Sequence, residues 1–96
     1  MDKQEAEKLL NESREKIDVL DKQILDLIVE RTSLAYDIIS SKKALEMDLF
    51  DAEREQNIKE NLRKSVAEID IDEDLIVQIF DLLATISKNE QKKYLD

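Results

Sequence analysis

The sequence predicts an all-α protein of three helices, one of them so long that it needs a partner chain. Two observations support the helical class. The 96 residues include no Gly and no Pro, which excludes collagen, phosphate-binding glycine loops and tight type I′ hairpins. Apolar residues also recur at spacings of three and four, which is typical of amphipathic helices. The length suits a single domain, 1–96, with a modest core.

The first predicted helix extends from about Lys3 to Leu45. Its apolar positions follow a nearly heptad pattern, interrupted at Arg31. These positions are Leu10, Ile17, Leu20, Ile24, Leu27, Leu34, Ile38 and Leu45. A helix of this length spans about 60 Å, far more than the width of a globule of this size. The pattern therefore predicts a second chain that covers the apolar stripe.

Two shorter helices are expected after a loop at residues 46–51. Asp51 is a suitable N-cap for a second helix that fades near Glu68, and Asp72 is a suitable N-cap for a third. The third helix carries an apolar face made of Ile76, Ile79, Phe80, Leu83 and Ile86. The same face continues through Ser87 and Gln91, which are polar where the pattern predicts apolar residues.

The composition excludes several classes of protein. Without Cys or His, the usual zinc, haem and thiol-nucleophile sites and the Ser-His-Asp triad are excluded. A net charge of −9 argues against nucleic-acid binding, because phosphate contacts need basic surface. No apolar run approaches the roughly 18 residues of a membrane span, and no signal-peptide pattern opens the chain. We therefore expect a cytoplasmic protein without metal, cofactor, nucleic-acid partner or membrane contact.

Arg31 and Lys42 are two cations within the apolar stripe of the first helix. They are eleven residues apart, or about three turns, so both face one side, with Cα atoms about 16 Å apart. Two long cationic side chains at this spacing suit a small anion. Burying them without a partner costs several kcal/mol. We therefore expect a negative group between them, either a carboxylate of the protein or a ligand.

The candidate site residues also have structural interpretations. Arg31 can fix the register of a coiled coil, and Lys42 can extend to solvent near the end of its helix. The other candidates can be surface charges, a helix cap or the polar end of a core face: Arg14, Asp51, Arg54, Glu55, Ser87 and Gln91. Arg14 is about 25 Å from Arg31 along a straight helix and lies on a different face of that helix. It can therefore reach a ligand held between Arg31 and Lys42 only from another subunit.

Five stretches resemble one known family in the same order and spacing. They are residues 13–21 (SREKIDVLD), residues 28–35 (IVERTSLA), Lys42, residues 51–55 (DAERE), and Ile79-Phe80 followed by Ser87 and Gln91. In these stretches the chain resembles the AroQ-type chorismate mutases, an all-helical family. The resemblance covers about residues 10–95. R-x-K-I-D occurs widely on helices, whereas the ordered set is highly specific.

The resemblance implies an intertwined homodimer whose helices form one bundle, with two equivalent sites each built from both subunits. It also implies an isomerase activity, the rearrangement of chorismate to prephenate at the shikimate-pathway branch toward phenylalanine and tyrosine. This reaction is an intramolecular pericyclic step and requires no nucleophile, metal, cofactor or proton transfer. The enzyme has to hold a flexible dianion in its reactive conformer and stabilise charge on the breaking ether oxygen.

The resemblance also implies a role for each residue. Arg14 of the partner subunit and Arg31 would hold the carboxylates of the substrate, with help from Ser87. Lys42 would bridge a carboxylate and the ether oxygen, and Gln91 would donate to that oxygen.

Three further residues match the hydroxyl-binding part of the family's site. Glu55 and the backbone at Asp51 would bind the ring hydroxyl, and Arg54 would support them without contacting the substrate.

Two alternatives remain: an isochorismate–pyruvate lyase of the same fold and a non-catalytic helical dimerisation module. Glu55 favours the mutase over the lyase. Ser87 and Gln91 favour an enzyme over the silent module, because they interrupt the apolar face of the third helix.

Overall fold

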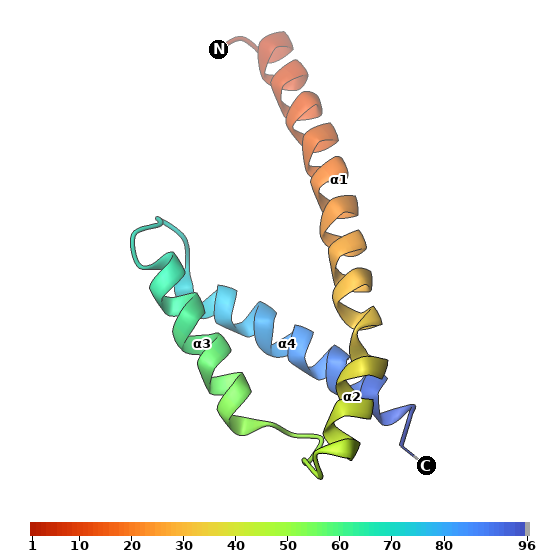
Figure 1. The fold of residues 1–96 in the computed structure, drawn as a ribbon. Coiled ribbons are helices and arrows are strands. Elements are labelled where there is room, and N and C mark those ends of the chain that lie inside the picture. The colour runs from red at the N-terminus through yellow and green to blue at the C-terminus, as the bar shows by residue number, and fades with distance from the viewer. Residues whose placement is uncertain (96) are drawn as a thin grey trace. The chain divides into compact units, whose positions relative to one another are not determined.

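The computed structural model describes residues 1–95 and contains four helical segments in this range (Figure 1). They are α1 (Lys3–Ser33), α2 (Ala35–Ala44), α3 (Ala52–Val66) and α4 (Glu73–Lys92). No strand is present in the described range, so the all-α prediction is confirmed. Within that range no helix combines the length and the apolar character that a membrane span requires. The chain divides into two compact units, Met1–Glu30 and a second unit that begins at Arg31.

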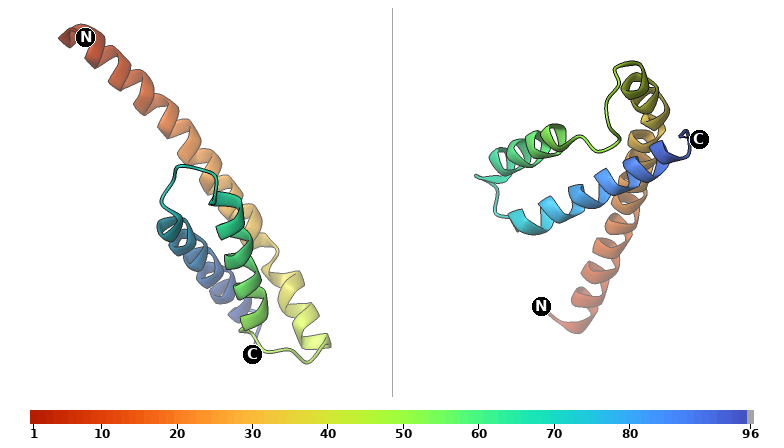
Figure 2. Two further views of the ribbon diagram at one scale, coloured as in Figure 1. Left: turned by 90° about the vertical axis from the view of Figure 1, so that its left-hand side faces the viewer. Right: turned by 90° about the horizontal axis from the view of Figure 1, so that it is seen from below.

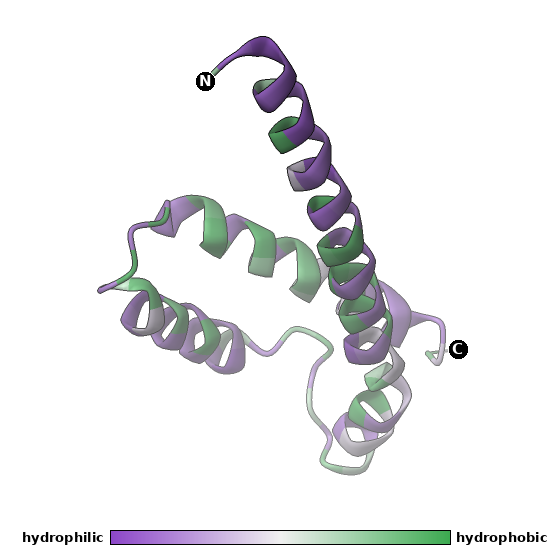
Figure 3. Ribbon diagram, turned by 90° about the horizontal axis from the view of Figure 1, so that it is seen from above, coloured by the Kyte–Doolittle hydropathy of each residue, from purple (hydrophilic) through white to green (hydrophobic). Residues whose placement is uncertain are grey.

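The first unit is a single amphipathic helical segment without a core. Asp2 caps its start, because Asp2 Oδ1 accepts a hydrogen bond from the backbone N–H of Glu5 at 2.8 Å. No residue of α1 is buried. Figure 3 shows apolar residues recurring between polar ones along α1. Except for the half-buried Ile28, the large apolar side chains of this unit are exposed, namely Met1, Leu9, Leu10, Ile17, Val19, Leu20, Ile24, Leu25, Leu27 and Val29. Such a helix gains little stability until another surface covers its stripe.

A turn at Leu34 divides the helix that the sequence predicts between about Lys3 and Leu45. The backbone N–H of Leu34 donates to the carbonyl of Arg31 at 3.3 Å, one residue closer than in an α-helix. The preceding Thr32 and Ser33 have lower helix propensity than straight-chain residues, which favours a local tightening here. The carbonyl of Leu34 then accepts from Ile38 at 3.0 Å as α2 begins. Arg31 and Lys42 therefore lie on separate helical segments.

The second unit is organised around α4. Helices α3 and α4 run antiparallel and are joined by a short loop, and α4 also contacts α2 (Figures 1 and 2). The buried apolar residues of the described chain are Ala35 and Ile39 from α2 and Val77 from α4. Gln91, near the end of α4, is buried as well although it is polar, with 3% of its surface exposed. A buried amide requires hydrogen-bond partners, which makes the end of α4 a place to look for function.

The two predicted N-caps are confirmed. The Asp51 side chain accepts from the backbone N–H of Arg54 at 3.1 Å, and α3 begins at the next residue. The Asp72 side chain accepts from the backbone N–H of Leu75 at 3.1 Å and starts α4 in the same way. Each cap satisfies a backbone donor that the first turn of a helix leaves unpaired.

The end of α2 shapes the loop that follows it. Glu46 has a φ of 57°, a left-handed conformation that is costly for a residue other than Gly. The backbone N–H of Met47 donates to the carbonyl of Lys42 at 2.8 Å, and that of Glu46 donates to Lys43 at 3.2 Å. This pair of bonds is a Schellman motif, which ends a helix and reverses the chain. The reversal brings the backbone of Leu49 next to the Lys42 side chain.

Candidate functional site

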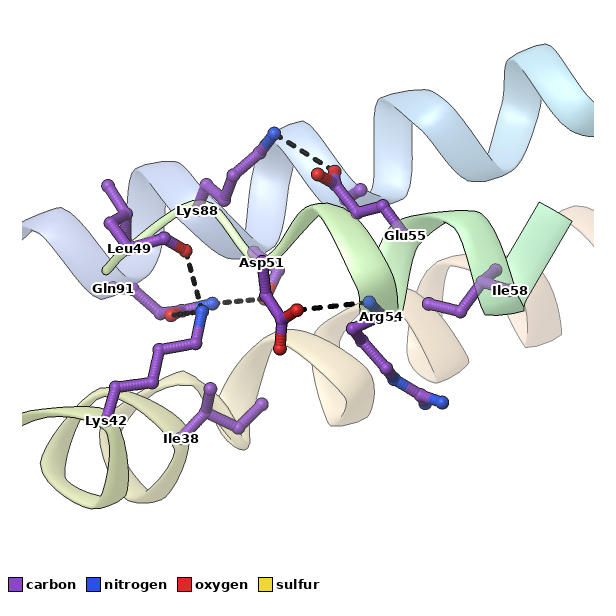
Figure 4. Close-up of a pocket in the computed structure, with 11 residues that line it drawn as sticks. Ile38, Lys42, Leu49, Asp51, Arg54, Glu55, Ile58, Lys88 and Gln91 are labelled. Carbon is purple, nitrogen blue, oxygen red and sulfur yellow. Dashed lines mark hydrogen bonds and ion pairs between the residues drawn. The ribbon is translucent and has the colours of Figure 1, made fainter. Parts of the chain in front are cut away.

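A cavity of about 340 Å³ lies in the second unit, between α2, α3, α4 and the loop before α3 (Figure 4). This volume falls within the range of small-molecule sites, about 300–1,000 Å³. Eleven residues line it: Ile38, Lys42, Leu49, Asp51, Arg54, Glu55, Ile58, Ala84, Ser87, Lys88 and Gln91. The lining therefore combines aliphatic side chains with three cations, two carboxylates, an amide and a hydroxyl.

The structure brings six of the eight candidate residues to this one cavity. These six are Lys42, Asp51, Arg54, Glu55, Ser87 and Gln91. Arg31 does not line the cavity, but its guanidinium contacts the same helix, α4, through the carbonyl of Leu83. Arg14 is exposed on α1, within the first unit. The roles that the resemblance assigns to all eight residues remain predictions.

Lys42 is held by two neutral acceptors at the cavity wall. Its Nζ donates to the carbonyl of Leu49 at 2.7 Å and to Oε1 of Gln91 at 3.0 Å (Figure 4). An ammonium has three hydrogens, so among the described residues one remains for a further acceptor. Neither contact neutralises the positive charge. The arrangement therefore presents an oriented cation to whatever occupies the cavity.

Gln91 is fixed in one orientation by its two neighbours. Because a lysine ammonium only donates, the amide has to turn Oε1 toward Lys42. The amide nitrogen, Nε2, then donates to the hydroxyl oxygen of Ser87 at 3.0 Å. Ser87 lies one turn earlier on α4, so this contact follows from the helix geometry. Within residues 1–95 one of the two Nε2 hydrogens is used, which leaves the second for a ligand.

Arg31 approaches α4 two turns before Gln91. Its NH1 donates to the carbonyl of Leu83 at 3.1 Å, and Leu83, Ser87 and Gln91 lie on successive turns. The sequence predicts a carboxylate or a ligand between Arg31 and Lys42. Within residues 1–95, neither cation forms an ion pair with a carboxylate. Their partners in this range are neutral carbonyl and amide oxygens, so the negative group expected between them stays a prediction.

The opposite wall of the cavity is formed by the first turn of α3. The carbonyl of Asp51 accepts from the backbone N–H of Glu55 at 3.1 Å, which places Glu55 one turn into the helix. Glu55 Oε1 accepts from Nζ of Lys88 at 3.0 Å (Figure 4). Its other oxygen, Oε2, is buried and has no hydrogen-bond partner within the described part of the chain. A buried acceptor without a donor is costly, so a ligand hydroxyl suits this position.

Sequence reasoning missed two polar contributors to the cavity, the Lys88 side chain and the Leu49 carbonyl. Lys88 is one of eleven lysines and belongs to no motif, although it lies four residues after Ala84 and three before Gln91, on the same side of α4. That spacing is the signal that identifies it. The carbonyl of Leu49 leaves no signal in a sequence, because every residue has one. Within the described residues, no cluster of acidic side chains is placed to hold a metal ion.

The arrangement can bind and orient an anion but offers no activated nucleophile. Ser87 carries the only hydroxyl in the lining, and it accepts from an amide rather than donating to a base. The donors are instead an ammonium and an amide, which are in contact with each other and both line the cavity. Such a site favours a reaction that needs positioning and charge stabilisation.

Comparisons with known proteins agree with this chemistry. The model of the family described as chorismate mutase type II matches residues 13–92. The chain is 42% identical over 87 residues to a chorismate mutase of Methanocaldococcus jannaschii, an alignment that covers 91% of this chain and 88% of that protein. It is 33% identical over 82 residues to a bifunctional chorismate mutase/prephenate dehydratase of Enterobacter agglomerans, covering 85% of this chain and 21% of that protein. No solved structure shows a significant match to the chain.

Proposed function

The chain belongs to the type II chorismate mutase family and is an isomerase, and we propose that the cavity described above is where it rearranges chorismate to prephenate. The observation that carries this assignment is the pairing of Lys42 with Gln91 at 3.0 Å. Each of these side chains keeps a hydrogen for an acceptor in the cavity. Two neighbouring donors suit the ether oxygen, on which negative charge grows as its bond to the ring breaks.

The remaining groups suit the rest of the substrate. Chorismate carries two carboxylates, and the cations that contact α4 provide opposite charge for them. In our proposal Arg31 and Ser87 hold the carboxylates, and Lys42 shares one of them with the ether oxygen. The unpartnered Oε2 of Glu55 accepts from the ring hydroxyl, close to the backbone at Asp51. Arg54 also lines the cavity, and we assign it a supporting role there.

The proposed active form is an intertwined homodimer in which two copies of domain 1–96 complete each site. The apolar side chains of α1 support this proposal, because they are exposed on a unit that has no core of its own. A second copy that covers this stripe removes the apolar area from water. It also carries the α1 residue Arg14, and we propose that Arg14 of the partner subunit completes the carboxylate site.

The assay that tests this function is the loss of chorismate ultraviolet absorbance on addition of the purified protein. We expect a rate proportional to protein concentration, with prephenate as the product. Lys42→Ala protein, purified in parallel, controls for mutases carried over from the expression host. Unchanged absorbance would leave a non-catalytic dimerisation module as the explanation. Pyruvate release from isochorismate, without chorismate turnover, would instead identify the lyase.

Gln91→Glu should shift the pH optimum of the reaction toward acid. In the wild-type protein an amide donates at every pH, whereas a carboxyl donates only when it is protonated. At neutral pH the new carboxylate would pair with Lys42, which is 3.0 Å from Gln91 Oε1, and occupy the ammonium. We therefore expect low activity near pH 7 that rises as the pH falls. A full pH profile of kcat/KM, compared with wild type, measures this, and an unchanged profile contradicts a contact between Gln91 and the ether oxygen.

A further inference from the structure

Lys88 forms an ion pair at the cavity that the roles assigned above do not use. Its Nζ lies 3.0 Å from Glu55 Oε1, and the two side chains are 28% and 24% exposed. This pair is therefore largely shielded from solvent, unlike the other ion pairs of the described chain, each of which has at least one side chain exposed by 41% or more. Shielded pairs are geometrically defined and respond strongly to the loss of one partner.

Lys88 is also held from a second direction. Its Nζ lies 4.8 Å from the centroid of the Phe50 ring, within the range of a cation–π contact. Phe50 comes from the loop immediately before the Asp51 cap, and Glu55 comes from the first turn of α3. The ammonium is thus located by one group on the loop and one on α3. A side chain held in this way has little freedom to leave the carboxylate.

The pair leaves the two oxygens of Glu55 with different environments. Oε1 accepts from Lys88, whereas Oε2 is buried without a partner in the described chain. If Lys88 were absent, the carboxylate would be free to rotate about its terminal torsion, which is a soft one. We propose that Lys88 is a positioning residue that holds Glu55 so that Oε2 accepts from the ring hydroxyl of the substrate. This inference rests on the proposed function and assigns a residue to it.

Lys88→Met tests the inference, because methionine keeps the length of the side chain and removes its donor and its charge. The hydroxyl contact exists in the bound substrate as well as in the transition state, so its weakening should raise KM by about five- to tenfold with little change in kcat. Lys88→Arg, which retains a cationic donor, should keep KM near the wild-type value. A purely structural role would instead lower the active fraction, and therefore kcat, without raising KM.

Two further measurements show whether Lys88 acts through Glu55. In a Glu55→Ala background, which has no side-chain acceptor for Lys88 or for the ring hydroxyl, adding Lys88→Met should change KM little, because the two substitutions remove one interaction. With a substrate analogue in which hydrogen replaces the ring hydroxyl, wild-type and Lys88→Met protein should have the same KM. An equal rise of KM in the Glu55→Ala background, or with the analogue, would overturn the inference and indicate direct contact with another part of the substrate.

The same experiment separates failure of this inference from failure of the proposed function. If wild-type protein turns over chorismate and Lys88→Met leaves KM unchanged, the positioning role is wrong and the function stands. If wild-type protein does not turn over chorismate, both are wrong. Circular dichroism of each variant at the assay temperature reports the folded fraction, by which every kcat is corrected.

Discussion

Lys42→Ala should lower kcat/KM for chorismate by at least about two to three powers of ten. Removal of one preorganised donor to a developing oxyanion typically costs about 3–4 kcal/mol, which corresponds to this loss of rate. The ammonium is held by Leu49 and Gln91 at 2.7 and 3.0 Å, so it is preorganised in this sense. The part of the loss that comes from the ether oxygen should appear in kcat, because charge develops on that oxygen only in the transition state, whereas loss of the carboxylate contact should raise KM.

The substitution also has a structural cost that the experiment must separate. Gln91 is 3% exposed, and without Lys42 its buried Oε1 loses a donor, at a cost of about 1–3 kcal/mol. Lys43→Ala is the matched control, since Lys43 is the next residue of α2 and its Nζ also donates to a backbone carbonyl, that of Tyr94 at 2.6 Å. Lys43 does not line the cavity, so its loss should leave kcat/KM within about twofold of wild type.

Helicity and dimer content complete the Lys42 test. Both should be close to wild type for Lys42→Ala at the assay temperature, so that the loss is one of chemistry. If the variant retained wild-type turnover, the ammonium would not contact the ether oxygen and the site would have to be assigned differently.

The helices could be predicted from the sequence because their signals are local. Asp51 and Asp72 are short side chains placed directly before apolar periodic segments, and each caps the helix that follows. The turn at Leu34 cannot be predicted from the apolar period, because after the interruption at Arg31 the period continues through Leu34 and Ile38. The backbone N–H of Leu34 bonds to the carbonyl three residues earlier, that of Arg31, instead of four residues earlier. This one bond ends α1, whereas the spacing of the apolar residues stays the same.

The cavity could be predicted only in part, for a related reason. Ser87 and Gln91 were identified because a polar residue on an apolar face contradicts the period, and Lys42 because it is a cation in an apolar stripe. Lys88 contradicts no period, and its importance depends on Glu55 and Phe50, which come from other parts of the chain. The left-handed Glu46 likewise carries no signal, because Gly is the usual residue there and this chain has none.

Mixing two inactive variants should restore activity if each site is shared between subunits. Arg14→Ala and Arg31→Ala should each lose most turnover as homodimers, because both sites then lack one cation for a carboxylate. In a heterodimer, one site combines the intact Arg31 of one chain with the intact Arg14 of the other. The second site lacks both. After subunit exchange at equal concentrations, about half of the dimers are mixed and half of their sites are complete, so about a quarter of wild-type activity should return.

The matched control is a mixture of Arg14→Ala with the Arg14→Ala/Arg31→Ala double variant. No combination of these chains contains a site with both arginines, so the mixture should stay inactive. Recovery in the first mixture alone would show that the two cations act across a subunit boundary. If exchange is complete by native mass spectrometry and the first mixture stays inactive, both arginines act within one chain or Arg14 does not act at the site. The exposed stripe of α1 supports the proposal of a shared site, because in the proposed dimer the contact that covers the apolar side chains would also deliver Arg14.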